Sequence, residues 1–376
     1  MNFSKRGIFK ACATVVAALA LSLAAHAADP VKIGAVLCTS GPFANLGLDE
    51  MRGAQLAVEH INAAGGVDGR QLELIVEDDQ SRADLGVVRA NKLVDQDKVS
   101  AMIACYGAGA VAYADMLRKN EVPLFGIIGS AALTQLGNPY VFRTGLGDPT
   151  VIESMTSLLQ RLGKKRVAVI YQGDTYGKGA ADLVAKAAKA RGYEVVADES
   201  FPIQANLDLT PQLTRIRSKN PDAIVVWAGT TPDIVALKNM QQLGMKVPVF
   251  GGPTMAAPSL LSAAGTAADG VYVPDTLNHG SPDAAQTKFL DDFKKKFNLA
   301  PSTSFAMMGY DTIQVVAAAA KGANGQGAKI KANGEKLTNV QGMMGSYSYT
   351  PENREGITPA SVKWYTISGG KFNRVP

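Results

Sequence analysis

Residues 31–77 read VKIGAVLCTSGPFANLGLDEMRGAQLAVEHINAAGGVDGRQLELIVE, and their pattern sets the expectation for the whole chain. The apolar run Val31–Leu37 predicts a buried strand. Asp49–Ala63 carries apolar residues at helical spacing on one face, and Gly65-Gly66 ends that helix. Gln71–Glu77 then resumes as a strand. This strand–helix–strand order is typical of parallel sheets whose strands are joined by helices.

The same alternation continues almost to the C-terminus. One set of strands and helices ends near Val122–Ile127, and a second set begins after Val141–Thr144. Two such sets in one chain predict two α/β lobes, each a parallel sheet with helices on both faces. The late helices, Ala284–Phe297 and Ser304–Lys321, could return to the first lobe. That return would require several chain crossings and would create a hinge.

The first 27 residues predict a signal peptide. Basic residues between Lys5 and Lys10 precede an apolar run at residues 11–25, and Ala25-His26-Ala27 supplies the small residues of a cleavage site. We therefore expect cleavage after Ala27 and export to the periplasm. Cleavage removes three basic residues and no acidic one, so the net charge falls from +5 to +2. So small a surplus argues against nucleic acid as a partner.

Two cysteines, Cys38 and Cys105, remain after cleavage. Each follows an apolar run expected to be a parallel strand, at Val31–Leu37 and Val99–Ala104. Strand ends at one sheet edge can lie close together, and the periplasm is oxidising, so a disulfide is one expectation. Two buried free thiols are the equal alternative. Neither cysteine is predicted to be a nucleophile, because no histidine lies nearby in the sequence.

Two glycine-rich stretches resemble nucleotide-binding loops but lack their chemistry. Gly107–Ala112 follows a strand and opens a helix, yet the next strand ends in Ile128-Gly129-Ser130 and not in the acidic residue that binds ribose. Free N–H groups at this helix start, aimed at a small anion, are the better interpretation. In Gly173–Gly179, three residues separate the glycines instead of four, and Gly179 stands where Ser or Thr should hold magnesium.

Catalytic chemistry has little support in the sequence. His60 and His279 are the only histidines after cleavage, and the sequence contains no zinc-protease motif and no nucleophile elbow. The acidic trio Glu77–Asp79 ends a strand, where a solvated loop is the simpler interpretation than a catalytic pair. We therefore expect no catalytic residue, no metal and no cofactor.

Several short motifs, taken in order, carry a resemblance to a known family. They are Lys32-Ile33-Gly34, Thr39–Pro42, Arg52–Ala57, Ile61–Arg70, Glu77–Asp79, Val122-Pro123, Phe142–Thr144, Asp174–Gly179 and Pro221–Ile224. In this order and spacing, the chain resembles the leucine/isoleucine/valine branch of ABC-transporter periplasmic binding proteins over nearly all of its mature length. The resemblance implies a type I fold, in which two doubly wound lobes are joined by a three-segment hinge. It places residues 28–146 and 275–345 in the N-terminal lobe, and residues 147–274 and 346–376 in the C-terminal lobe.

The resemblance also implies a ligand between the lobes, gripped first by the N-terminal lobe. The ligand carboxylate would take backbone N–H groups and hydroxyls from two loops after strands, at Tyr106-Gly107 and Ile128-Gly129-Ser130. Ser130 supplies the hydroxyl expected in the second loop. The hydroxyl expected in the first loop is missing, because Tyr106 or Gly107 stands at that position. The residues that would close from the C-terminal lobe are Tyr176, Thr230 and Thr254.

Thr254 bears on the class of ligand. Amino-acid binders of this family pair the ligand ammonium with an acidic residue after Gly-Pro, in the stretch that matches Gly252-Pro253-Thr254, but Thr254 is neutral. Burying an unpaired ammonium is costly. We therefore expect a carboxylic acid without an ammonium group, aromatic or otherwise, or a neutral amide. An acid from another loop, such as Asp174, would restore amino-acid binding.

An apolar wall should meet the body of the ligand. The candidates are Phe43, Leu46, Trp227 and Phe305. Ordinary core packing is the equal alternative for each, because aromatic side chains dominate cores as well as pockets. Phe43 and Leu46 are the stronger candidates because the Thr39–Gly47 loop should border the cleft.

These observations predict a monomeric protein that captures a small carboxylate-bearing molecule by closure of two lobes and delivers it to an ABC permease in the inner membrane. A branched-chain or other amino-acid-binding protein is the alternative in ligand class. A sensor that reports its ligand to a membrane receptor and an enzyme with a closing cleft are the alternatives in function.

Overall fold

The computed structural model describes residues 29–202 and 206–376, so the predicted signal peptide and its cleavage site lie outside the described residues. The strands of a first sheet are β1 (Val31–Leu37), β2 (Leu72–Asp78), β3 (Ala101–Ala104), β4 (Leu124–Gly126) and β5 (Val141–Arg143). All of them run parallel, in the order β2-β1-β3-β4-β5. β1 is buried at every position except Lys32, as its apolar run predicted.

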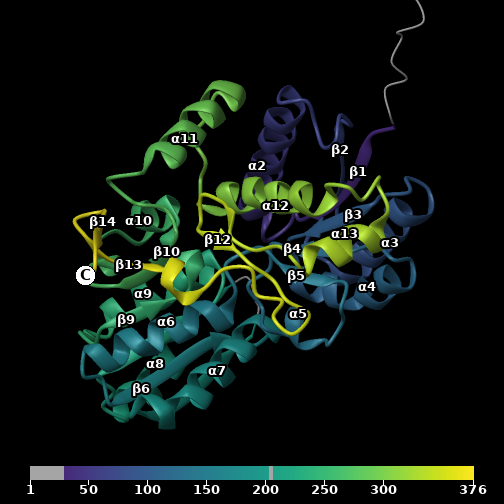
Figure 1. The fold of residues 1–376 in the computed structure, drawn as a ribbon. Helices are drawn as coiled ribbons and strands as arrows, with labels where there is room; N and C mark the ends of the chain where they lie inside the picture. Colours follow the sequence, from purple (N-terminus) through teal and green to yellow (C-terminus); the bar gives the residue numbers. More distant parts are fainter. Residues whose placement is uncertain (1–28, 203–205) are drawn as a thin grey trace, which may run out of the picture.

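A second sheet holds the later strands. They are β6 (Arg166–Gln172), β7 (Glu194–Phe201), β8 (Ala223–Trp227), β9 (Val249–Gly251), β10 (Tyr272–Asp275), β13 (Lys363–Ser368) and β14 (Lys371–Arg374). Their order is β14-β13-β10-β9-β8-β6-β7, with only the β13 and β14 pairings antiparallel. Gly369 and Gly370 join β13 to β14 with φ of 56° and 71°, the left-handed values of a two-residue hairpin turn. Two sheets in one chain confirm the predicted α/β fold (Figure 1).

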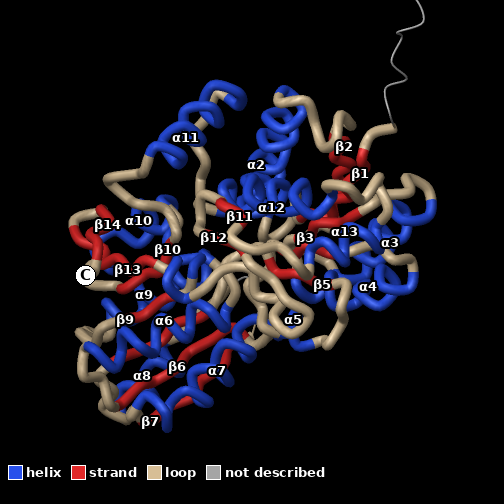
Figure 2. The backbone as a smooth tube through the Cα atoms, in the orientation of Figure 1, coloured by secondary structure: helices blue, strands red, loops and turns tan. Residues whose placement is uncertain are grey.

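Layers of helices cover both faces of each sheet (Figure 2). The α-helices around the first sheet are α2 (Ala44–Ala63), α3 (Ala83–Asp95), α4 (Gly107–Lys119), α5 (Ala132–Gln135), α11 (Ala284–Phe297), α12 (Phe305–Ala320) and α13 (Gly327–Gly334). Those around the second sheet are α6 (Asp148–Arg161), α7 (Thr175–Arg191), α8 (Thr210–Ser218), α9 (Thr230–Gln242) and α10 (Pro258–Ala264). Within residues 29–202 and 206–376, no helix combines the length and apolar character that a membrane span requires.

Alternate residues of β1 face opposite helical layers, because successive side chains of a strand point to opposite faces. Ile33 and Ala35 belong to the core that α2 and α12 share, whereas Val36 packs with α3 and α4. In the second sheet, α6 and α7 cover one face, and α8, α9 and α10 cover the other.

α12 returns to the first sheet and packs closely on α2. A Cβ atom on Gly53 would lie 1.8 Å from the carbonyl oxygen of Ala306, and one on Gly309 would lie 2.1 Å from the carbonyl oxygen of Glu50. Only glycine permits such an approach of two helix backbones. The sequence left open whether this late helix returns to the first sheet. Its packing on α2 confirms that it does.

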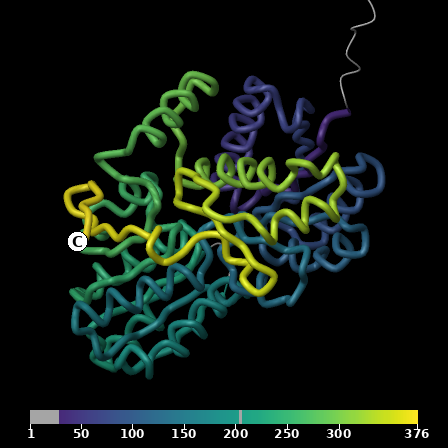
Figure 3. The backbone as a smooth tube through the Cα atoms, in the orientation of Figure 1, coloured from purple at the N-terminus to yellow at the C-terminus, as the bar shows by residue number. Residues whose placement is uncertain are grey.

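Three segments of the described chain pass between the sheets: after β5, after β10, and from β12 (Ser346–Tyr347) to β13 (Figure 3). β12 pairs only with β11 (Val340–Gln341). Side chains tie the segments together. The Tyr347 hydroxyl lies 3.2 Å from the carbonyl oxygen of Thr144, and the Gln286 amide donates to the carbonyls of Thr276 and Met343 at 3.2 and 3.1 Å. The lobe boundaries given by the resemblance stay a prediction.

Candidate ligand-binding site

A cavity of about 350 Å³ lies where the two sheets face each other, and loops from both line it. The loops that follow β1, β3 and β4 form one side, and those that follow β6, β8 and β9 form the other. The carboxyl ends of parallel strands meet at one edge of a sheet, so loops far apart in sequence converge there. Such an edge is the usual place for a small-molecule site in α/β proteins.

Nine of the ten predicted ligand-binding residues line this cavity. They are Phe43, Leu46, Tyr106, Gly107, Ile128, Gly129, Ser130, Tyr176 and Thr254. Thr230 does not; its hydroxyl lies 3.4 Å from the carbonyl oxygen of Thr254. The cavity brings the other nine together, and their contact with a ligand stays a prediction.

The two loops predicted to grip a carboxylate lie side by side. A Cβ atom on Gly107 would lie 3.3 Å from Cγ2 of Ile128 and 3.5 Å from Cβ of Ser130. Tyr106 is the N-cap of α4 and gives no side-chain cap, so the first N–H groups of the helix lack that partner. The Ser130 hydroxyl is buried without a hydrogen-bond partner. Free donors from both loops therefore meet at the cavity, which suits an anionic group.

Arg143 holds the Ile128–Ser130 loop in place. Its guanidinium donates to the carbonyl oxygens of Gly129 and Ser130 at 3.0 and 2.9 Å, and also to that of Ile128. Arg143 is 1% exposed, and its Nε lies 2.7 Å from Oε2 of Glu355. Reasoning from the sequence gave this arginine no role, although it ends a buried strand, where a charge needs a partner.

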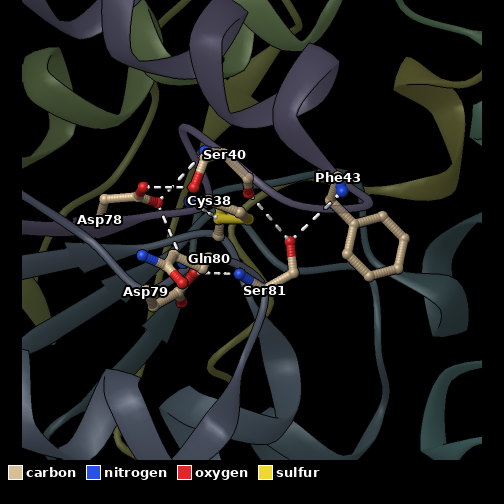
Figure 4. Close-up of a disulfide and its surroundings, with 8 residues drawn as sticks. Cys38, Ser40, Phe43, Asp78, Asp79, Gln80 and Ser81 are labelled. Atoms are coloured by element: carbon tan, nitrogen blue, oxygen red, sulfur yellow. Dashed lines mark hydrogen bonds between the residues drawn. A yellow bond between two sulfur atoms is a disulfide. The ribbon is translucent and has the colours of Figure 1, made fainter.

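A disulfide joins Cys38 and Cys105, which follow β1 and β3. This settles the alternative that the sequence left open, and the bond lines the cavity. Figure 4 shows how the adjacent loop is tied down: Ser40 donates to Asp78, and the backbone N–H of Phe43 donates to the Ser81 hydroxyl at 3.3 Å. The Phe43 ring extends away from these bonds (Figure 4).

The opposite wall is built from groups that already have partners. The Thr254 hydroxyl lies 2.8 Å from the carbonyl oxygen of Ala228 and 2.7 Å from Oδ2 of Asp233. Burial raises the pKa of Asp233 well above its ordinary value. A protonated Asp233 can therefore donate to Thr254, which donates to Ala228 in turn. The hydroxyl of Thr254 is thus engaged, whatever its side chain contributes to the wall.

The predicted apolar candidates divide into two groups. Phe305 lines the cavity, together with Met308 one turn further along α12. Trp227 is fully buried and lies behind Tyr176, with ring centroids 6.1 Å apart. Trp227 therefore supports the wall from behind.

Two buried acids in the cavity wall had no role in the sequence prediction. Asp148 has no exposed surface, and neither of its carboxylate oxygens has a hydrogen-bond partner. Burial raises its pKa to about 8, although the nearby Arg143 opposes the rise. The indole N–H of Trp227 also lowers this pKa without completing a well-aligned hydrogen bond. Glu50 is 1% exposed, and its Oε2 has no partner.

Asp174, the acid that the sequence offered for an ammonium group, is engaged. Its Oδ1 accepts from the backbone N–H of Gly177 at 2.9 Å, which caps α7, and its Oδ2 accepts from the Gln172 amide at 2.7 Å. Asp148 is therefore the better partner for a ligand cation. Its position at the start of α6 resembles an ordinary first-turn acid, which hides it in the sequence.

Two sheets, one parallel and one mostly parallel, that present loops and helix starts to a shared cavity define a two-lobed ligand-binding protein. The chain belongs to the periplasmic binding protein family, whose model matches residues 30–369. This confirms the family and the type I fold that the motifs implied.

Named relatives agree with this assignment. The Leu/Ile/Val-binding protein BraC3 of Rhizobium johnstonii is 30% identical over 312 residues, which cover 81% of this chain and 82% of that protein. The Leu/Ile/Val-binding protein of Escherichia coli K12 is 28% identical over 318 residues, covering 84% of each. Among solved structures, the branched-chain amino acid transporter substrate-binding protein LivJ from Streptococcus pneumoniae, in complex with isoleucine, is 29% identical. Its TM-score is 0.79, over 92% of this chain and 99% of that one. All three relatives are named as binding proteins.

Proposed function

We propose that the protein captures a small monocarboxylate with an apolar body and delivers it to an ABC permease in the inner membrane. The observation that carries this proposal is the unpartnered, buried hydroxyl of Ser130 beside the free N–H groups at the start of α4. A carboxylate accepts charge-assisted hydrogen bonds from such donors without a salt bridge. Phe43, Leu46 and Phe305 supply apolar surface for the rest of the ligand.

A ligand without an ammonium group fits the charge of the cavity. Thr254 offers no charge, and its hydroxyl bonds to protein groups. The pKa of Asp148 is raised to about 8, and that of Glu50 also lies well above its ordinary value, both chiefly through burial. Asp148 is therefore mostly protonated at neutral pH, and burial also disfavours the charged form of Glu50. An organic acid, aromatic or aliphatic, meets no fixed charge from these two groups.

An apolar amino acid is the second candidate, and Asp148 is the observation in its favour. Both of its oxygens are free, and ionising a group with a pKa about one unit above the ambient pH costs about 1.4 kcal/mol. An ammonium group close to Asp148 could offset that cost. Relatives at 28–30% identity are named Leu/Ile/Val-binding proteins, which points the same way.

In this proposal, the two lobes close on the ligand before the protein delivers it to the permease. The N-terminal lobe, residues 28–146 and 275–345, binds the carboxylate first through Ser130 and the start of α4. The C-terminal lobe, residues 147–274 and 346–376, then closes with Tyr176. A ligand that touches both lobes favours the closed state by its differential affinity. The protein acts as a monomer after cleavage behind Ala27, and the closed form docks on the permease.

Calorimetric titration with matched ligand pairs tests the proposal. 4-Methylpentanoate and leucine differ only in the ammonium group, as do 3-phenylpropanoate and phenylalanine. We expect the organic acid of at least one pair to bind more than tenfold tighter than its amino acid. Tighter binding of leucine or phenylalanine would establish the second candidate instead. If no member of either pair binds, the carboxylate assignment is wrong.

A further inference from the structure

Glu50 is a buried acid in an apolar part of the cavity wall. It lies one helical turn after Leu46 on the same face of α2, and both line the cavity. Phe305 and Met308, three residues apart on α12, line it too, as does the disulfide of Cys38. Glu50 therefore shares this part of the cavity wall with apolar and sulfur-bearing side chains, a costly setting for an unsatisfied polar atom.

Oε2 of this carboxyl group is buried and has no hydrogen-bond partner among the described residues. None of the described residues that line the cavity is Lys, Arg or His. Buried polar atoms without partners are rare in native proteins and call for an explanation. Because Glu50 lines a cavity large enough for a small molecule, a ligand atom is the natural partner for it.

The surroundings of Glu50 disfavour its charged form. Burial raises its pKa well above the ordinary value, and the nearby carboxylates of Asp49 and Asp79 raise it further. Asp49 is itself engaged by the hydroxyls of Ser302 and Thr303 at 2.8 and 2.9 Å. Oδ1 of Asp79 accepts a hydrogen bond from the backbone N–H of Ser81 at 2.8 Å. A protonated Glu50 can donate one hydrogen bond and accept another.

We propose that Glu50 is a specificity residue that receives a hydroxyl group on the body of the ligand, so that the preferred ligand is a hydroxylated monocarboxylate. A hydroxyl can accept from the protonated carboxyl group and donate back to it. This inference rests on the proposed carboxylate function and narrows it to molecules with a second, uncharged polar group. It also explains why a buried acid without a partner at Oε2 is tolerated in the cavity wall.

Titration of matched ligands into matched variants tests the role of Glu50. The probes are benzoate and 3-phenylpropanoate, each compared with its ring-monohydroxylated derivatives. We expect at least one derivative to bind the native protein about tenfold tighter than its parent. Glu50→Met, which keeps the length of the side chain but removes its polar atoms, should reduce that ratio to below twofold while leaving the parent acid's affinity nearly unchanged.

Two further variants separate specificity from folding. Glu50→Gln keeps a neutral hydrogen-bonding side chain and should retain most of the hydroxyl preference. Glu73→Gln, at an exposed position of β2, should change nothing. Because Glu50→Met removes an unsatisfied buried atom, its melting temperature should equal or exceed that of the native protein. If Glu50→Met does not fold, Glu50→Leu replaces it.

The outcomes distinguish this inference from the function on which it rests. Equal binding of hydroxylated and parent acids by the native protein would overturn the role of Glu50 alone. A hydroxyl preference that survives in Glu50→Met would also overturn it. If neither parent nor derivative binds although 4-methylpentanoate does, the inference alone fails. If 4-methylpentanoate does not bind either, the proposed function fails with it.

Discussion

The two sides of the cavity hold their polar groups in opposite states. On the side of the five-stranded sheet, the Ser130 hydroxyl and Oε2 of Glu50 are buried without a partner. On the side of the seven-stranded sheet, the Thr254 hydroxyl bonds to Ala228 and Asp233, and Asp174 caps α7. The first side thus keeps unsatisfied groups, whereas these groups of the second side bond within the protein. Asp148, at the start of α6 and beside Gly129, is the exception.

This difference indicates that the two sides have different roles: one recognises the ligand, and the other gives the closed cavity its shape. An unsatisfied buried group loses nothing in the folded protein when a ligand bonds to it, so it can contribute directly to affinity. An engaged group would have to break a protein bond first. We therefore expect the first side to select the ligand, while the second side provides a surface that closes over it. Substitutions on the two sides should differ in whether they change affinity or stability.

Replacing Arg143 should have the largest effect, because this residue supports the selecting side. Arg143→Met leaves Glu355 without its charged partner and removes one donor from each of the carbonyl oxygens of Gly129 and Ser130. Breaking a buried ion pair costs about 3–5 kcal/mol, so the free energy of unfolding measured in urea should fall by that amount. Ligand affinity should fall with it, because the Ser130 loop loses its support.

The matched control is a surface pair. Arg82 lies 2.5 Å from Asp84, and both are exposed. Arg82→Met should change the free energy of unfolding far less than Arg143→Met does, because both members of the pair are exposed to water. A similarly small loss for Arg143→Met would mean that the Ile128–Ser130 loop keeps its conformation without the arginine.

Ser130 and Thr254 offer the sharpest test of the comparison, with an intermediate effect. Ser130→Ala removes one hydrogen bond to a charged ligand group, worth about 1.5–3 kcal/mol, so affinity should fall about 10- to 150-fold. Its stability should hardly change, because the hydroxyl bonds to nothing in the protein. Titration calorimetry and thermal unfolding of the same samples measure both quantities.

Thr254→Val should show the reverse. It leaves Asp233 and the carbonyl oxygen of Ala228 unsatisfied, and the stability loss should be about 1–3 kcal/mol. The ligand affinity should change less than about threefold, measured at a temperature at which the variant is still fully folded. An affinity loss as large as that of Ser130→Ala would contradict the division between the two sides.

The regular elements of the fold were predictable because their signal is local. The run Val31–Leu37 became β1 with the predicted bounds. The start of α2 was not predictable: the helix begins at Ala44 and not at Asp49. Its first turn contains Gly47, a poor helix former, where a Cβ atom would lie 2.2 Å from the carbonyl oxygen of Cys38. That packing is tertiary and leaves no periodic trace in the sequence.

The binding site also has a part that the sequence predicts and a part that it does not. The loops at Tyr106-Gly107 and Ile128–Ser130 follow strands, so topology alone brings them to one edge. Glu50 and Asp148 look like ordinary acids in helices, which face water in most proteins. Their burial depends on where α2 and α6 lie relative to the cavity. Glu50 still had a usable signal, since it is four residues after Leu46 and so shares its helical face.

The smallest predicted effect concerns the pH dependence that Asp148 imposes on stability. Its pKa is raised from 3.8 to about 8, chiefly by burial and against the effect of Arg143. Glu355 and Asp174 also face it and support the rise. Between these two pKa values, the folded protein holds a proton that the unfolded chain has released. Raising the pH therefore favours the unfolded state and lowers the free energy of unfolding.

Asp148→Asn cannot titrate and removes this contribution. From pH 7 to pH 8, the native protein should lose about 1 kcal/mol relative to Asp148→Asn, measured as the difference between their urea unfolding free energies. Asp84→Asn is the control, because Arg82 holds the pKa of Asp84 below its usual range, and its difference from the native protein should stay constant. A constant difference for Asp148→Asn as well would mean that Asp148 is ionised in the empty cavity. The cavity would then carry a fixed negative charge, which would favour an ammonium-bearing ligand over a simple acid.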